Sequence, residues 1–136
     1  MKEIHSKLED LRKYANLLKG YREKGKDQLG SDLTLRGAVE RYLHVAIECV
    51  LEIGEMMISK EGWRKPETYR EVIETLGEKD VLPSKFAESF SRVAGLRNIL
   101  VHRYADVDLD ELYHHLQEDI EDFDEFARHV AQYLSD

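Results

Sequence analysis

The amino-acid sequence predicts an all-α fold, an up-and-down antiparallel bundle of four main helices plus one short helix. Apolar residues recur every three or four positions along most of the chain, and no segment alternates with the two-residue period of a strand. Only 2 Pro and 8 Gly interrupt the 136 residues, and no linker is long enough to separate two domains. At about 100–200 residues per domain, we expect residues 1–136 to form a single domain.

The first two predicted helices are separated by a short loop. The first ends around residues 21–24, and its apolar stripe consists of Ile4, Leu8, Leu11, Ala15 and Leu18. Residues 23–31 have the composition of a loop, and Ser31 or Asp32 is a suitable N-cap for a helix from about Leu33 to Lys60. The stripe of this second helix consists of Tyr42, Val45, Ala46, Cys49, Val50, Ile53, Met56 and Met57. Because Cys49 lies on the stripe, we interpret it as a buried core residue and not as a reactive thiol.

Three further helices are predicted after the segment EGWRKPE (61–67). Trp63 in this segment suits either an exposed partner contact or a lid over the bundle end. A short helix with Tyr69 follows and ends at Gly77, and Pro83 suits the first turn of a fourth helix. The apolar positions of the fourth helix are Phe86, Phe90, Val93, Ala94, Leu96 and Leu100. After the polar break ADVDLD (105–110), we expect a fifth continuous helix from Leu109 to Leu134.

Composition excludes several classes of protein. The chain is 42% hydrophobic, which is enough for a core, but no apolar stretch approaches the roughly 20 residues of a membrane span. The N-terminus lacks the apolar stretch of a signal peptide, so we expect a cytoplasmic protein. A single Cys forms neither an internal disulfide nor a cysteine-based zinc site.

Charge is distributed unevenly along the chain. The net charge of −8 argues against a general affinity for duplex DNA. Residues 85–104 nevertheless carry a net charge of +3, whereas residues 105–136 carry −10. A short basic segment in an acidic protein indicates a local anion site.

Arg97 is the anomaly of the fourth helix. It lies four residues after Val93, where it interrupts the apolar stripe with a permanent cation. Burying it unpaired costs several kcal/mol, so it must meet a carboxylate, a subunit interface or an anionic ligand. His102 lies about 140° further around an ideal helix. The two converge only if the helix ends or distorts near residues 101–103, or if a second subunit supplies the partner. The positions of Arg97 and His102 are also explained without a ligand. In that interpretation Arg97 forms an ion pair with a carboxylate of the second helix, and His102 is a cation at the C-terminal end of the fourth helix.

Residues 97–104 read RNILVHRY, or R-N-x3-H-x-Y. This motif resembles the Arg-x4-His-x-Tyr signature of the HEPN superfamily, in its HepT-like branch. The segment RGAVERYLHVAIECVLEIG (36–54) resembles the long second helix of that branch. The resemblance covers most of the chain, with the helices in the expected order.

The resemblance implies a metal-independent endoribonuclease that cleaves single-stranded RNA and is the toxin of a type VII-like toxin–antitoxin pair. It implies a homodimer in which the two signature helices meet at a cleft. It also implies a cognate minimal nucleotidyltransferase antitoxin, which silences the toxin by transferring AMP from ATP onto the motif tyrosine, here Tyr104. No cofactor and no metal are expected in the toxin itself.

The residue chemistry agrees with these implications. RNA carries its own nucleophile in the 2′-OH, so an enzyme needs only a proton acceptor and a cation at the phosphate. His102 is the candidate general base or acid, and Arg97 offers a bidentate fork for phosphate oxygens. We expect Asn98 and Arg103 to bind substrate, although Asn98 equally suits a solvent-facing helix position. Tyr104 is the expected AMP acceptor.

Two other functions remain as alternatives. The first alternative is a non-catalytic HEPN module that binds nucleotide or RNA and acts through its nucleotidyltransferase partner. The second is a structural bundle in which Arg97 forms an internal salt bridge. The pairs His114–Glu118 and His115–Asp119 have the i,i+4 spacing of metal ligands. No third ligand is identifiable, so we expect no metal site there.

Overall fold

The computed structural model describes residues 2–102 and 107–136, and every regular element in these residues is a helix. In chain order the helices are α1 (Lys2–Arg22), α2 (Lys26–Ser31), α3 (Leu33–Glu61), α4 (Tyr69–Glu78), α5 (Ser84–Phe90), α6 (Val93–His102), α7 (Leu109–Glu118) and α8 (Ile120–Ser135). The predicted all-α fold is therefore confirmed.

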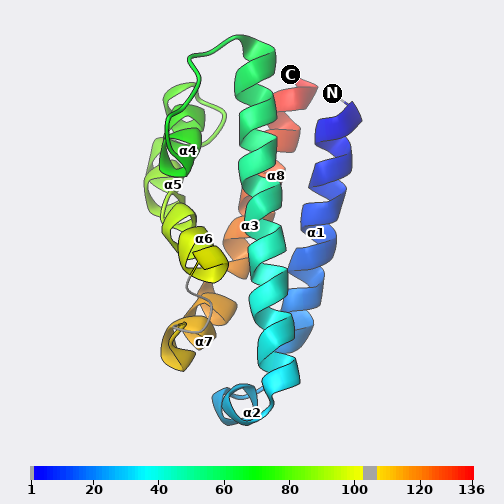
Figure 1. Ribbon diagram of the computed structural model, residues 1–136. Coiled ribbons are helices and arrows are strands. Elements are labelled where there is room, and N and C mark those ends of the chain that lie inside the picture. Colours follow the sequence, from blue (N-terminus) through cyan, green and yellow to red (C-terminus); the bar gives the residue numbers. More distant parts are fainter. Residues whose placement is uncertain (1, 103–106) are drawn as a thin grey trace.

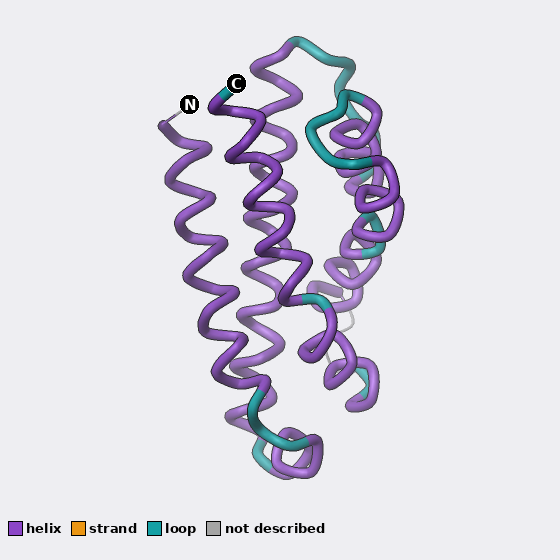
Figure 2. The backbone as a smooth tube through the Cα atoms, turned by 180° about the vertical axis from the view of Figure 1, so that it is seen from behind, coloured by secondary structure: helices purple, strands orange, loops and turns teal. Residues whose placement is uncertain are grey.

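Helix α3 is the central element of the bundle. In Figure 1, α1 lies along one side of α3, α4–α6 lie along the other, and α8 lies behind it. Figure 2 shows from behind that α8 lies between α1 and the column of α4–α6, with both termini at the same end. No helix lies in front of α3 in Figure 1, and its residues Gly37, Arg41 and Glu55 are exposed. Each of the long helices therefore contributes to one core, while α3 keeps an open face.

The stripe of α1 and most of the stripe of α3 follow from the sequence, although Tyr42, Val45 and Met56 of α3 are only partly buried. All five predicted apolar residues of α1 are buried. The side chain of Asp32 accepts a hydrogen bond from the Leu35 amide at 3.1 Å, which confirms Asp32 as the N-cap of α3. Gly62 ends α3 in the left-handed region with φ 71°, a conformation that favours glycine. The buried surface of α3 is wider than the predicted stripe because α3 contacts α1, α4, α6 and α8. It includes Leu35, Val39, Leu43, Ile47 and Leu51.

The prediction of a loop over residues 23–31 is wrong for its second half, which forms α2. The side chain of Leu29 is buried, and α2 contacts both α3 and α7. Gly30 lies so close to Leu109 that a Cβ there would stand 2.7 Å from the leucine side chain. Lys26 also forms an ion pair with Asp110. Tertiary packing against α7 thus stabilises one and a half turns of helix in a segment with the composition of a loop.

The predicted fourth helix is two helices, α5 and α6, separated at Ser91 and Arg92. The Ser91 side chain is buried and its hydroxyl donates to the Glu88 carbonyl at 2.8 Å. The next amides bond three residues back, Ala94 to Ser91 at 3.2 Å and Gly95 to Arg92 at 3.0 Å. These bonds make a tight 3₁₀-like turn between the two helices. The regular α-helical hydrogen bonding is therefore interrupted between α5 and α6.

The predicted fifth helix is likewise divided, at Asp119. Asp119 ends α7, where its amide donates to the His115 carbonyl at 2.9 Å, and its own carbonyl accepts from the Phe123 amide at 3.3 Å. The two halves share α1 as a neighbour but differ in the other, because α7 also contacts α2 and α8 also contacts α3. The predicted apolar period continues across the division, and its central residues are buried. These are Leu112, Leu116, Ile120, Phe123, Ala127 and Val130.

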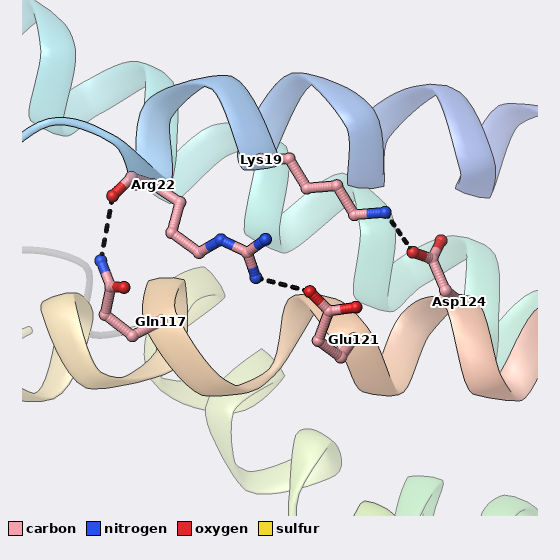
Figure 3. A network of polar contacts seen from close by, with 5 residues as sticks. All are labelled: Lys19, Arg22, Gln117, Glu121 and Asp124. Atoms are coloured by element: carbon pink, nitrogen blue, oxygen red, sulfur yellow. Dashed lines mark hydrogen bonds and ion pairs between the residues drawn. The ribbon is translucent and has the colours of Figure 1, made fainter.

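Polar contacts join α1 to α7 and α8 along the rim of the core, as Figure 3 shows. Lys19 pairs with Asp124, and Arg22 pairs with Glu121 at 2.7 Å. The Gln117 side-chain amide donates to the Arg22 carbonyl at 3.1 Å. Basic side chains in the last turn of α1 therefore partly offset the acidic stretch at the α7–α8 junction.

Cys49 is buried, and burial raises the pKa of its thiol to about 11. The interpretation of Cys49 as an inert core residue is therefore confirmed, because the reactive thiolate does not form near neutral pH. Within residues 2–102 and 107–136, none of the helices combines the length and the apolar character needed to cross a bilayer.

Candidate active site

Helix α6 carries both predicted catalytic residues, Arg97 and His102. The side chain of Arg97 has contacts with two other helices. The Arg97 Nε donates to Glu48 Oε1 of α3 at 2.7 Å, and its guanidinium carbon lies 4.6 Å from the centroid of the Tyr69 ring. Its Nη1 donates to the Asn98 side-chain oxygen at 3.3 Å. The Arg97 side chain is 16% exposed. The guanidinium is thus held in one orientation at the edge of the core.

This arrangement explains why an arginine is tolerated within an apolar stripe. A carboxylate of the second long helix compensates the charge, and an aromatic face covers the flat surface of the guanidinium. The pairing matches the alternative that the sequence left open, an ion pair with that helix. A guanidinium has five N–H donors, and Nε plus one Nη1 donor account for two of them in the described chain. Among the described residues the other three donors have no protein partner, which suits an anionic ligand while Glu48 is engaged.

His102 lies at the exposed C-terminal end of α6. Helix α6 ends at His102, within the range 101–103 where the sequence analysis allowed the helix to end or distort. On an ideal helix the two side chains lie about 140° apart. Both routes to convergence, the helix end and a second subunit, stay predictions. Asn98 is exposed beside Arg97, which fits either of its predicted interpretations.

Arg103 and Tyr104 lie outside the described residues, so the predicted roles in substrate binding and AMP acceptance stay predictions.

Sequence reasoning missed three residues around Arg97, namely Glu48, His44 and Tyr69. His44 Nε2 lies 3.5 Å from Glu48 Oε1, and the other ring nitrogen lies 3.5 Å from Arg41 Nη1. The spacing of residues 41, 44 and 48 places them on one face of α3, which is the signal that would have grouped them. No pattern pointed to Tyr69, because its contact depends on how α4 packs beside α6.

The histidine pair of α7 does not form a recognisable metal site. His115 Nδ1 lies 2.5 Å from Asp119 Oδ2, as its i,i+4 spacing allows. His114 and His115 line a shallow groove of about 450 Å³ between α7 and α6, together with Arg92 and Ile99. Among the residues that the structure describes, no group of three or more His, Cys, Asp or Glu side chains is arranged to hold a metal ion.

Comparison with known proteins assigns the family. The model of the ribonuclease HepT-like family matches residues 5–130. The chain belongs to this family. It is 26% identical over 96% of its length to the tRNA nuclease HepT of Aphanizomenon flos-aquae, of which it covers 89%. It is also 27% identical over 73% of its length to the mRNA nuclease HepT of Shewanella oneidensis, of which it covers 74%.

Solved structures support the fold of this HepT-like protein. One is the tri-AMPylated Shewanella oneidensis HEPN toxin in complex with MNT antitoxin, at a TM-score of 0.86 and 22% identity. It matches 95% of this chain and 96% of that one. Another is a toxin–antitoxin with AMP-PNP, at a TM-score of 0.89 and 22% identity, matching 97% and 99% of the two chains. The predicted HEPN-like helical bundle is confirmed by these likenesses.

Proposed function

We propose that residues 1–136 form one HepT-like domain that acts as the toxin of a toxin–antitoxin pair, a metal-independent endoribonuclease of single-stranded RNA. One observation carries the proposal: in a chain of the ribonuclease HepT-like family, Arg97 is oriented by Glu48 and Tyr69 on the same helix that presents His102 to solvent. Relatives named as tRNA and mRNA nucleases support RNA as the substrate class.

In the proposed reaction the RNA supplies its own nucleophile. A histidine base accepts the proton of the 2′-OH, the 2′-oxygen bonds to the adjacent phosphorus, and the bond from phosphorus to the 5′-oxygen breaks. The departing 5′-oxygen takes a proton from the acid form of a histidine. Arg97 donates to the non-bridging oxygens as negative charge builds on them, and Asn98 and Arg103 hold the strand. The products are a 2′,3′-cyclic phosphate and a 5′-hydroxyl, and no cofactor takes part.

We further propose that the active form is a homodimer. On an ideal helix positions 97 and 102 point in different directions, and a second α6 would place a histidine opposite Arg97. The exposed side of α6 permits close approach, because Gly95 is exposed and an added Cβ there would have no neighbour within 4 Å. Twofold pairing is also the commonest form of oligomer.

The proposed partner is a nucleotidyltransferase antitoxin in the cytoplasm that silences this toxin by adding AMP to Tyr104. The tri-AMPylated relative bound to its MNT antitoxin supports this assignment. The Tyr104 oxygen would bond to the α-phosphorus of ATP and displace pyrophosphate. The added phosphate would then compete with RNA for Arg97, at the high effective concentration of a tethered group.

The partner hypothesis predicts a covalent change in mass. Incubation of the wild type with the antitoxin and Mg-ATP should add one or more AMP units, whereas Tyr104→Phe should add none and should escape silencing. Intact mass spectrometry measures both proteins. Inhibition of the wild type without any added mass would show that the antitoxin acts by steric masking.

The nuclease itself is tested by the chemistry of its product. The purified protein in excess EDTA should cleave single-stranded RNA to a 2′,3′-cyclic phosphate and leave the matching DNA intact, because DNA lacks the 2′-OH. Strict dependence on added divalent metal would contradict the mechanism. Binding of RNA without cleavage would favour the non-catalytic module.

A further inference from the structure

A cavity of about 840 Å³ lies between the C-terminal half of α3, the segment 62–68 and the start of α4. Its walls include the aromatic side chains of Trp63 and Tyr69, and its apolar lining includes Ile58 and Val72, both 2% exposed. Trp63 also contacts Tyr133, at 6.5 Å between ring centroids, and Lys79, whose Nζ lies 5.7 Å from the centroid of the indole. The cavity therefore has aromatic walls of the kind that stack on a planar ligand.

The cavity adjoins Arg97 through a shared residue. Tyr69 lines the cavity and also packs against the Arg97 guanidinium at 4.6 Å. Glu55, another lining residue, lies two turns along α3 from Glu48, or about 10 Å. A stacked strand rises about 3.4 Å per nucleotide, so a strand with one phosphate at Arg97 reaches the cavity within about three nucleotides. In Figure 1 the segment 62–68 runs from the end of α3 down to α4 on the side where α6 lies.

The polar lining selects among planar ligands. Glu55 and Glu67 are exposed carboxylates that accept hydrogen bonds and disfavour a phosphate inside the cavity. Lys65 also lines the cavity and suits a phosphate next to it. Among the four RNA bases, guanine presents two neighbouring N–H donors, at N1 and N2, which match the two oxygens of one carboxylate. Bases of single strands are recognised in this way, by aromatic stacking and by hydrogen bonds to their Watson–Crick edges.

We propose that this cavity binds one guanine base of the RNA strand whose phosphate lies at Arg97. The inference deepens the proposed function and rests on it, since it assumes that RNA is the ligand of the Arg97 site. It assigns Trp63 and Tyr69 to stacking, and Glu55 and Glu67 to the recognition of the base edge. The consequence is a preference for guanosine at one fixed position within three nucleotides of the cleaved bond.

The sequence offers a direct reporter, because Trp63 is the only tryptophan among the 136 residues. The experiment follows Trp63 fluorescence while titrating RNA oligonucleotides that cannot be cleaved, because every 2′-OH is methylated and no nucleophile is left. The set differs only in guanosine or uridine at each of three flanking positions. We expect fluorescence quenching and at least tenfold tighter binding with guanosine at one position. The double variant Glu55→Gln/Glu67→Gln should lose this ratio, whereas Glu9→Gln, an exposed substitution on α1, should keep it.

The outcomes separate this proposal from the nuclease itself. If the wild type cleaves RNA but Trp63 fluorescence does not change with any oligonucleotide, the guanine site is wrong and the nuclease stands. Equal affinity for guanosine and uridine, or a ratio unchanged in the double variant, also overturns the site. Guanosine-selective quenching by a protein that fails to cleave RNA in EDTA would support the base site and contradict the proposed nuclease.

Discussion

The guanidinium of Arg97 has a carboxylate partner on α3 and an aromatic partner on α4, and both come from helices far from it in the sequence. The Glu48 side chain is 29% exposed, so it would be poorly solvated if its partner were removed. Arg97 therefore serves stability as well as the proposed chemistry. A loss of activity in an Arg97 variant is informative only if the two effects are separated.

A double variant separates them. Arg97→Ala should lower the free energy of unfolding by about 1–3 kcal/mol, because the half-buried Glu48 carboxylate loses its hydrogen bond from Arg97 and keeps only the longer contact with His44. Adding Glu48→Gln should restore most of that stability but none of the RNA cleavage. Denaturant unfolding and cleavage rates measure the two properties on the same proteins. Recovery of cleavage together with stability would mean that Arg97 is only structural.

Arg97 and His102 could be predicted from the sequence, because a charged residue within an apolar stripe and the motif that follows it are both sequence patterns. Glu48, His44 and Tyr69 could not. Their contacts depend on the rotation of α3 and α4 about their axes, and several carboxylates of α3 had suitable spacing.

At the scale of elements, periodicity predicted which segments are helical but not where two of them break. The stripe continues in phase through Ser91–Arg92 and through Asp119, so hydrophobic spacing carries no sign of either break. The Ser91 hydroxyl bond to the Glu88 carbonyl is a local cause, but serine occurs within intact helices as well. Helix α2 depends on packing against α7, which local composition does not encode.

Two glycines of α3 should respond in opposite ways to the same substitution. At Gly37 an added Cβ would have no neighbour within 4 Å, so Gly37→Ala should raise the free energy of unfolding by up to about 1 kcal/mol. At Gly54 the Cβ would overlap the Val72 side chain, where α4 packs closely on α3. Gly54→Ala should therefore destabilise the protein by about 1–3 kcal/mol. Denaturant midpoints compare the pair, and equal effects would contradict the close α3–α4 packing.

At the scale of the whole molecule, the fold supplies one half of the proposed site. The single chain orients Arg97, keeps His102 exposed at the end of α6 and leaves one face of α3 open between α1 and α6. The acidic stretch after residue 105 limits non-specific attraction of RNA, so binding must come from specific groups. We therefore propose that a second copy of the chain completes the set of arginine and histidine side chains at the active site.

The dimer is tested by mass and by a substitution on α6. Light scattering at micromolar concentration should give twice the 15.9 kDa of one chain. Gly95→Trp should yield a folded monomer that does not cleave RNA, because position 95 is exposed, its Cβ would have no neighbour within 4 Å, and the ring would block a second helix. Gly20→Trp on α1, an equally open position, should remain a dimer. A wild type of 15.9 kDa would remove the proposal.

The rate of RNA cleavage in EDTA by His102→Ala tests the central claim most directly. His102 is exposed, so its substitution should leave the melting temperature unchanged. We expect the rate to fall by about 10²–10⁴, the usual contribution of a general acid or base. A His102→Ala protein that cleaves RNA at the wild-type rate would contradict the assignment of catalysis to α6.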